Sequence, residues 1–429
     1  MACSSVTTNS DDLTEQTSKP DRRSQEVIST DKIIETEAAA ELNSDDEITS
    51  QSHITINAYN GAILISGETA NEALKNKIKG EALFMRAFCH FGLYQFYSNT
   101  SDGSALALAY METPDLLPQA RITVAPYMAK LNADLVAAKS LVPATNTDIA
   151  RASKQAVTAL QARVALYMKD YANAATFATE YITALPLASK TNFPLIWKDA
   201  NNSEVAFKLT NTTTAGTRIG ALYRGTSANA ANIGTVTWRP SQALLNAYDQ
   251  VNDIRYAAYF FEEPLLKASS SRSLAAILIN KYVGGAYGTP TELLADGKVF
   301  RTGEMYLIRA EARAETNDLT GAAAQIKLVR DARFGSAQAA PVFANPTAAW
   351  SGVLAERRLE LAFEGHRFFD LVRWGIAAQV LNQYIAVEKI RRPFLTTALF
   401  TAGRDEYLPI PQSEITFTNG LYKQNPGYN

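Results

Sequence analysis

The spacing of apolar residues predicts a chain that is mostly helical from Gly80 onwards. Residues 80–98 are apolar almost all round, which is the pattern of a helix covered on more than one side. A long stretch rich in Thr, Asn, Gly and Ser, at about 186–238, indicates an irregular insertion with short strands at Glu204–Leu209 and Arg218–Tyr223. Long ordered loops tend to carry function. Other ranges with helical spacing are 124–141, 147–169, 172–184, 240–262, 299–316, 319–333, 347–363 and 368–383.

A different pattern precedes residue 80. Residues 31–43 have the spacing of a short amphipathic helix, and His53–Tyr59 and Ala62–Ser66 alternate apolar and polar positions as strands do. Asn60-Gly61 joins the two strands, and this pair is a strong hairpin signal because both turn positions favour positive φ. We therefore expect a helix and a β-hairpin, a small α+β fragment, ahead of the helical body.

The helical body contains an internal repeat at an offset of 148 residues. Ala162–Ala174 and Ala310–Ala322 each contain a helix of small residues, a tight turn with Asp170 or Asp318, and a second Ala-rich helix. This pattern resembles tetratricopeptide (TPR) hairpins, in which small residues let paired helices approach closely. It predicts two helical hairpins that stack only if the body folds back on itself.

Composition excludes several classes of protein and of metal site. The 429 residues hold 41 Lys+Arg and 43 Asp+Glu, so the net charge of −2 lacks the basic excess of a nucleic-acid binder. No apolar stretch approaches the roughly 18 residues that a membrane-spanning helix needs. Two cysteines, Cys3 and Cys89, rule out a disulfide scaffold and a Cys-rich zinc site. The three histidines lie far apart in the sequence, so we expect neither a metal nor a cofactor.

Three glutamates at intervals of four residues stand out in segment 356–375. Glu360 and Glu364 could be the carboxylate pair of a glycosidase, or, with Glu356, part of a structural salt-bridge network at the Gly-His corner. Arginines in the segment should keep the carboxylates ionised, which is wrong for a general acid, so we expect the structural role. His366 is then a hydrogen-bonded corner residue. The other charged residues at helical spacing are Arg357, Arg367, Asp370 and Arg373. No hydrolase, phosphate-binding or zinc-protease motif is present, and we predict no enzyme.

Four segments together resemble the SusD/RagB family over about residues 80–429, in the family's order and spacing. They are residues 80–97 (GEALFMRAFCHFGLYQFY), 299–333, 356–375 (ERRLELAFEGHRFFDLVRWG) and 406–428. The resemblance implies a mainly α fold of TPR-like hairpins with a long irregular, short-strand insertion. It also implies a non-catalytic surface lipoprotein of the outer membrane, which captures glycans or other nutrients for a SusC-like, TonB-dependent transporter.

The amino-terminal part resembles a second family. Residues 20–78 contain HITINAYNGAILISGETANEALKNKI and are similar to the BON domain of envelope lipoproteins, but the closing part of that domain is missing. We therefore divide the chain into a tether at 1–20, a truncated BON-like segment at 21–79 and a nutrient-binding domain at 80–429. A natural fusion, a chimaera or joined reading frames could each create a junction near residue 79. Such a junction predicts an under-covered apolar face on the helix at 80–98.

The first residues of the chain predict a lipid anchor. Cys3 follows a small residue and precedes a polar run, as in a mature bacterial lipoprotein, which predicts lipidation of the native precursor.

The alternative to nutrient binding is a helical-repeat or BON-type envelope interaction protein without a small ligand.

Sugar binding in water depends on flat aromatic faces, so aromatic residues in irregular regions are the ligand candidates. The resemblance gives Trp238 and Tyr282 structural positions, which leaves Tyr287 and Tyr223 as the favoured contacts. The full set is Tyr287, Tyr223, Trp197, Tyr110, Tyr282 and Trp238.

Overall fold

The computed structural model divides the chain into two compact units, residues 1–144 with 371–429, and residues 145–370. Predictions for Cys3, the tether at 1–20, the helix at 31–43 and Tyr287 lie outside the described residues. The described ranges are 52–59 and 62–69 (backbone), 71–100, 102–113, 117–145, 147–214, 218–223, 238–263, 277–286, 288–391 and 399–428.

The first unit is built on two long helices, α4 (Glu72–Tyr97) and α5 (Val124–Leu141). The Asn71 side chain caps α4 by accepting a hydrogen bond from the Leu74 N–H at 3.1 Å. At Gly80 the two helices meet so closely that a Cβ would lie 2.8 Å from the Leu141 Cβ. This glycine therefore sets the distance between the helices.

Helix α4 runs without a break through residue 79, so the structure has no boundary at the predicted junction. Phe84 and Phe91 are buried, whereas Leu93 is 38 % and Phe96 49 % exposed. The carboxyl-terminal segment ties to the end of α4, because the Leu408 N–H donates to the Phe96 carbonyl at 2.7 Å. This unit also contains α17 (Ala377–Arg391) and α18 (Gln412–Phe417).

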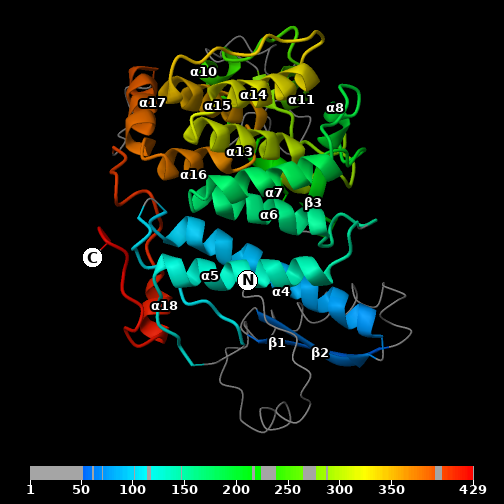
Figure 1. Cartoon of the computed structure of the whole chain (residues 1–429), viewed down its shortest axis with the longest axis vertical. Coiled ribbons are helices and arrows are strands. Elements are labelled where there is room, and N and C mark those ends of the chain that lie inside the picture. The colour runs from blue at the N-terminus through cyan, green and yellow to red at the C-terminus, as the bar shows by residue number, and fades with distance from the viewer. Residues whose placement is uncertain are drawn as a thin grey trace. The chain divides into compact units, whose positions relative to one another are not determined.

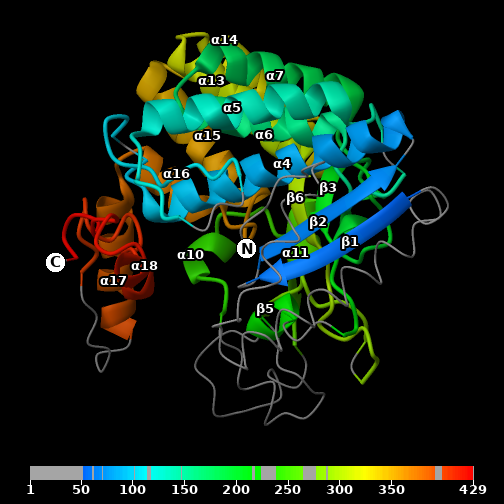
Figure 2. The same cartoon turned by 90° about the horizontal axis from the view of Figure 1, so that it is seen from below.

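The predicted β-hairpin is confirmed. Strands β1 (Ser52–Tyr59) and β2 (Ala62–Thr69) pair antiparallel, with Tyr59 opposite Ala62, and lie side by side in Figure 2. This register places two residues, Asn60 and Gly61, between the strands, as a tight hairpin requires.

The second unit stacks helices in layers (Figure 1). Helices α6 and α7 pack together, α7 packs on α13, and α13 packs on α14 and α15. The two copies of the internal repeat therefore do stack, and the TPR-like hairpin prediction is confirmed. The bounds are α6 Lys154–Tyr167, α7 Tyr171–Ala184, α13 Thr302–Glu315, α14 Leu319–Arg333 and α15 Pro346–Glu360.

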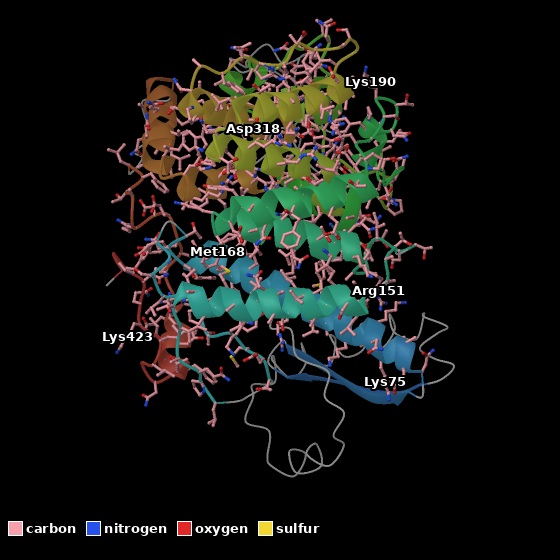
Figure 3. All side chains as sticks on the ribbon, viewed as in Figure 1. Lys75, Arg151, Met168, Lys190, Asp318 and Lys423 are labelled. Carbon is pink, nitrogen blue, oxygen red and sulfur yellow. The ribbon has the colours of Figure 1, made fainter. Side chains whose placement is uncertain are left out.

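Both repeat copies turn in the same way. Lys169 and Asn317 adopt positive φ angles of 57° and 63°, which ends the first helix of each pair. The next residue caps the second helix: Asp170 accepts from the Asn173 N–H at 3.2 Å, and Asp318 accepts from the Gly321 N–H at 2.8 Å. Figure 3 labels Met168 and Asp318, which lie at these two turns.

Short strands join the helical layers. Strand β3 (Val205–Leu209) pairs antiparallel with β6 (Gly297–Arg301), and β4 (Phe260–Glu262) pairs with β5 (Ile277–Ile279). Strand β3 confirms the predicted strand at Glu204–Leu209.

Three predicted elements differ from the structure in this region. The predicted strand at Arg218–Tyr223 is a 3₁₀ helix, η1 (Ile219–Leu222). The predicted helix at 240–262 breaks into α10 (Gln242–Leu245), α11 (Ile254–Tyr259) and β4, whose residues pair with strand β5. The predicted helix at 299–316 begins as β6, which pairs with β3, and continues as α13.

The predicted helix at 368–383 also divides, into α16 (His366–Arg373) and α17, at Gly375. Gly375 has a φ of 69°, which an α-helix cannot accommodate.

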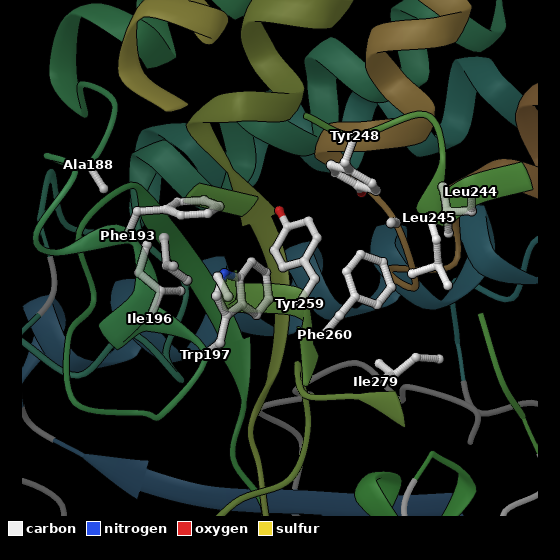
Figure 4. Close-up of a cluster of buried hydrophobic side chains, with 13 residues drawn as sticks. Ala188, Phe193, Ile196, Trp197, Leu244, Leu245, Tyr248, Tyr259, Phe260 and Ile279 are labelled. Atoms are coloured by element: carbon white, nitrogen blue, oxygen red, sulfur yellow. The ribbon is translucent and has the colours of Figure 1, made fainter. Parts of the chain in front are cut away.

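An aromatic core includes the first part of the irregular insertion (Figure 4). The ring of Trp197 meets that of Tyr259 edge to face at 5.5 Å, and Phe193 meets Trp197 at 6.1 Å. Phe193 and Trp197 belong to α8 (Phe193–Ile196) and its cap, so this short helix is anchored by burial of large rings.

Candidate functional site

Glu360, at the end of α15, is the centre of a buried network of charges. Its carboxylate accepts from Arg301 at 3.0 Å and from Arg333 at 2.9 Å, and Arg255 approaches to 3.3 Å. All four side chains are almost completely buried. Burial favours the neutral acid, but the three guanidinium groups outweigh it and hold the pKa of Glu360 far below its ordinary value.

The neighbouring acids are paired in the same way. Glu364 accepts from Arg301 and Lys281, both at 2.7 Å. Burial opposes ionisation, yet these two cations lower the pKa of Glu364 to about 2. A carboxylate with such a low pKa holds no proton to donate at neutral pH. Glu360 and Glu364 therefore have the structural role expected from the sequence, not that of a glycosidase pair.

The partners of these glutamates differ from those in the sequence prediction. The predicted partners were arginines within 356–375, but Arg357 instead binds Asp370 at 2.8 Å. The cations on Glu360 come from β6, α14 and α11, between 27 and 105 residues away. Helical spacing shows only neighbours on one helix, so it missed partners that the fold supplies.

His366 follows Gly365, whose φ of 83° makes the corner. Its Nδ1 lies 3.8 Å from the Glu304 carboxylate, which binds Arg163 at 2.6 Å. Burial lowers the pKa of His366 to about 4, so the imidazole is neutral at pH 7. No group of three or more potential metal ligands occurs in the described part of the chain.

Buried side chains bind the carbonyls at the end of α15. The Tyr259 hydroxyl donates to Glu360 O at 2.8 Å, Lys281 donates to Ala362 O at 2.8 Å, and Tyr282 donates to Phe363 O at 3.1 Å. These donors satisfy carbonyls that a helix end leaves free. They also hold Phe363 at a φ of 66°, which is strained for an aromatic residue.

Trp197 and Tyr110 are buried, which corrects their prediction as sugar contacts. Trp197 is 2 % exposed, and the ammonium of Lys281 lies 3.9 Å from its ring centre. Tyr110 is 3 % exposed, stacks on His90 at 4.1 Å and donates to Asp134 at 2.6 Å. Neither ring offers a free face, because the fold buries loop aromatics that the sequence only marks as lying outside helices.

Tyr282 is also a packing residue, but it supports a ring that reaches the surface. It is 6 % exposed and stacks on the half-buried Tyr223, with ring centres 5.6 Å apart and an angle of 25°. The ring of Phe363 also packs on Tyr223, with ring centres 6.0 Å apart. Two rings therefore fix the plane of Tyr223.

Trp238 is 58 % exposed. Its backbone N–H donates to the carbonyl of Leu222, the residue before Tyr223, at 2.9 Å. Leu222 is itself 43 % exposed. We use the name loop face for the surface that consists of Arg218, Leu222, Tyr223 and Trp238.

The loop face rests on the segment around residues 282–293. The Gly220 N–H donates to Leu293 O at 3.3 Å, and Arg218 Nη1 donates to Glu292 O at 2.5 Å. A Cβ on Gly220 would lie 2.2 Å from the Tyr282 carbonyl oxygen, so only glycine fits this approach. Arg218 is not among the site residues predicted from the sequence, because a lone arginine in a polar segment carries no motif.

Comparison with known proteins agrees with the arrangement of helices and loops described above. Residues 257–428 match the family model described as the SusD family. Residues 9–166 match a model described as "Starch-binding associating with outer membrane". The chain matches SusD-type families in both halves. No described helix has the length and apolar character to cross a membrane.

Individual SusD-like proteins show the same likeness. "SusD-like protein P25" from Formosa agariphila is 22 % identical, over 86 % of this chain and 77 % of the relative. The surface glycan-binding protein A structure from Bacteroides fluxus is 24 % identical, with a TM-score of 0.67 over 84 % of this chain and 80 % of that one. The Bacteroides thetaiotaomicron protein of the same name, solved with laminarihexaose, is 18 % identical, with a TM-score of 0.65 over 83 % and 79 %. The fold is thus the TPR-like, mainly helical SusD type.

The match over residues 9–166 gives no support to a BON domain. A single SusD-type model runs across residue 79, as α4 does. The β-hairpin signal was correct, but a hairpin beside a helix occurs in many folds, and it was too small a pattern to name a family.

Proposed function

We propose that this protein binds an oligosaccharide without cleaving it, and that the loop face contacts the sugar. The observation that carries the proposal is the exposed Trp238, whose backbone is bonded to Leu222, the residue before Tyr223, together with the stacking of Tyr223 on Tyr282. Pyranose rings have apolar C–H faces, and a rigid aromatic ring binds them with little loss of side-chain entropy. Tyr287 remains a predicted contact.

The related proteins support this ligand class. Two similar structures are named surface glycan-binding proteins, one of them in complex with laminarihexaose, and a third is named a laminarin-binding SusD-like protein. The proposal includes the cellular role that the resemblance implies. A lipid on Cys3 anchors the protein at the outer-membrane surface, and a SusC-like, TonB-dependent transporter receives the glycan.

Affinity electrophoresis of the full chain in gels that contain single polysaccharides tests the proposal. We expect retardation by at least one glycan, and an affinity about tenfold or more weaker for Trp238→Ala and Tyr223→Ala. Phe417→Ala is the matched control, since it removes an exposed ring, 66 % accessible, from α18. Retardation that survives both loop-face substitutions would contradict the placement of the site.

Two further outcomes would contradict the function itself. Release of reducing ends during incubation would show catalysis. Absence of retardation by every glycan, in a sample with a cooperative unfolding transition, would favour the envelope interaction protein.

A further inference from the structure

The guanidinium of Arg218 lies at the edge of the loop face without a carboxylate partner. Arg218 is half-buried, and among the described residues its hydrogen bond is from Nη1 to the uncharged carbonyl of Glu292, at 2.5 Å. It forms no ion pair with any residue that the structure describes. A carbonyl, and no described carboxylate, therefore holds its positive charge in place.

Three other arginines of the same unit are paired with carboxylates instead. Arg163, Arg301 and Arg333 each have a carboxylate oxygen within 2.9 Å. A guanidinium binds carboxylates and sulfate-like groups through two parallel N–H donors, and Arg218 keeps Nε and Nη2 for that purpose. A half-buried cation with two donors to spare is suited to an anionic ligand.

The position of Arg218 relative to the rings fits a chain of sugars. Arg218 and Tyr223 are the two cap residues of η1, a four-residue 3₁₀ helix. At a rise of about 2 Å per residue, their Cα atoms are about 10 Å apart, a span that a disaccharide covers. The close contact at Gly220 keeps this spacing, because the backbone there cannot move away from Tyr282 and Leu293.

We infer that the glycan bound at the loop face is acidic, and that Arg218 pairs with the carboxylate or sulfate of a sugar next to the one stacked on Tyr223. The inference rests on the proposed function and adds the class of glycan. A neutral glucan could stack on the rings but would leave the charge of Arg218 uncompensated, so an anionic polymer gains a charge-assisted hydrogen bond that a neutral one lacks.

Three polysaccharides separate the alternatives in affinity gels of the full chain: alginate carries carboxylates, carrageenan carries sulfates, and laminarin is neutral. We expect one anionic polymer to bind better than laminarin, and Arg218→Gln to weaken that binding about tenfold or more. Binding should also weaken between 50 and 500 mM salt by more in the wild type than in Arg218→Gln. The preferred polymer identifies the anionic group.

Two variants control for general effects. Arg313→Gln removes an exposed arginine that pairs with Asp318 at 2.5 Å, and should leave the affinity unchanged. Arg218→Lys keeps the charge but not the planar fork, and should bind more tightly than Arg218→Gln even if both are less stable.

Failure of the inference differs from failure of the proposed function. Binding of laminarin alone, or an anionic glycan that binds Arg218→Gln as tightly as wild type, would overturn the acidic class and leave glycan binding intact. Absence of binding by all three polymers and by every other glycan tested, in folded protein, would overturn both.

Discussion

The buried network at Glu360 and the loop face use arginine in opposite ways. Arg301 is 1 % exposed and bonds to the carboxylates of Glu204, Glu360 and Glu364. Arg218 is half-buried and bonds to one uncharged carbonyl. Buried ions stabilise a fold only when partners saturate them, and a saturated ion has nothing left for a ligand. The charge-rich segment 356–375 therefore has a structural role, and Arg218 is the candidate for binding.

The two regions touch through consecutive residues. Lys281 donates to Glu364 in the network, and Tyr282 stacks on Tyr223 at the loop face. This link connects the rigid part of the unit to the surface ring, so stability and affinity can be separated by substitution on either side of it.

The largest expected effect comes from Glu360→Gln. The substitution leaves three buried arginines short of a negative partner, which should lower the free energy of unfolding by about 3–5 kcal/mol. Arg313→Gln breaks an exposed pair instead, 41 % and 45 % accessible, and should change it by less than about 1 kcal/mol. Chemical denaturation of both variants measures the difference, and equal losses would mean that Glu360 does not hold the buried arginines as described.

The next effect is a loss of stability in acid. The pKa of Glu364 is about 2 in the folded protein, against an ordinary value of 4.5. Because the folded value is the lower one, its stabilisation is complete above about pH 4.5 and is lost as the pH falls towards 2. The loss amounts to about 3 kcal/mol.

The comparison with Glu364→Gln isolates this effect, since the variant has no carboxylate to protonate at that position. Unfolding free energies measured from pH 6 down to pH 2 should converge for the two proteins. A constant gap over that interval would contradict the low pKa.

An intermediate effect is expected for Gly220→Ala. The added Cβ would meet backbone atoms of Tyr282 and Leu293 at 2.2 and 2.9 Å, so the loop face must shift. We expect a loss of about 1–3 kcal/mol in stability and a clear loss of glycan affinity. Gly335→Ala is the control, because no atom lies within 4 Å of its Cβ position. Retained affinity in Gly220→Ala would show that the sugar binds elsewhere.

The smallest effect is expected for Tyr282→Phe. This change removes the hydrogen bond to Phe363 O but keeps the ring under Tyr223. Stability should fall by about 1 kcal/mol, while glycan affinity stays within about twofold. Tyr282→Leu removes the ring as well and should weaken binding more. Equal affinities for these two variants would show that the stack does not position Tyr223.

Local signals predicted much of the helical framework. The bounds of α5 and α14 agree with the predicted ranges 124–141 and 319–333, and the repeat around Asp170 and Asp318 predicted two hairpins that do stack. These features depend on helical periodicity, caps and small residues, which are recognised from residues close together in the sequence. The prediction of a single helix at 240–262 was wrong at its end, because residues 260–262 form strand β4 and pair with residues 277–279.

The sequence alone determined the helical class, the β-hairpin, the turns of the repeat and the ionised state of Glu360 and Glu364. Tertiary structure decided which cations reach Glu360, why Trp197 is buried while Trp238 is exposed, and why Arg218 stands alone. The physical reason is the range of the interactions. Helix and turn formation depend on residues within about five positions, whereas burial and charge compensation depend on groups that only the folded chain brings together.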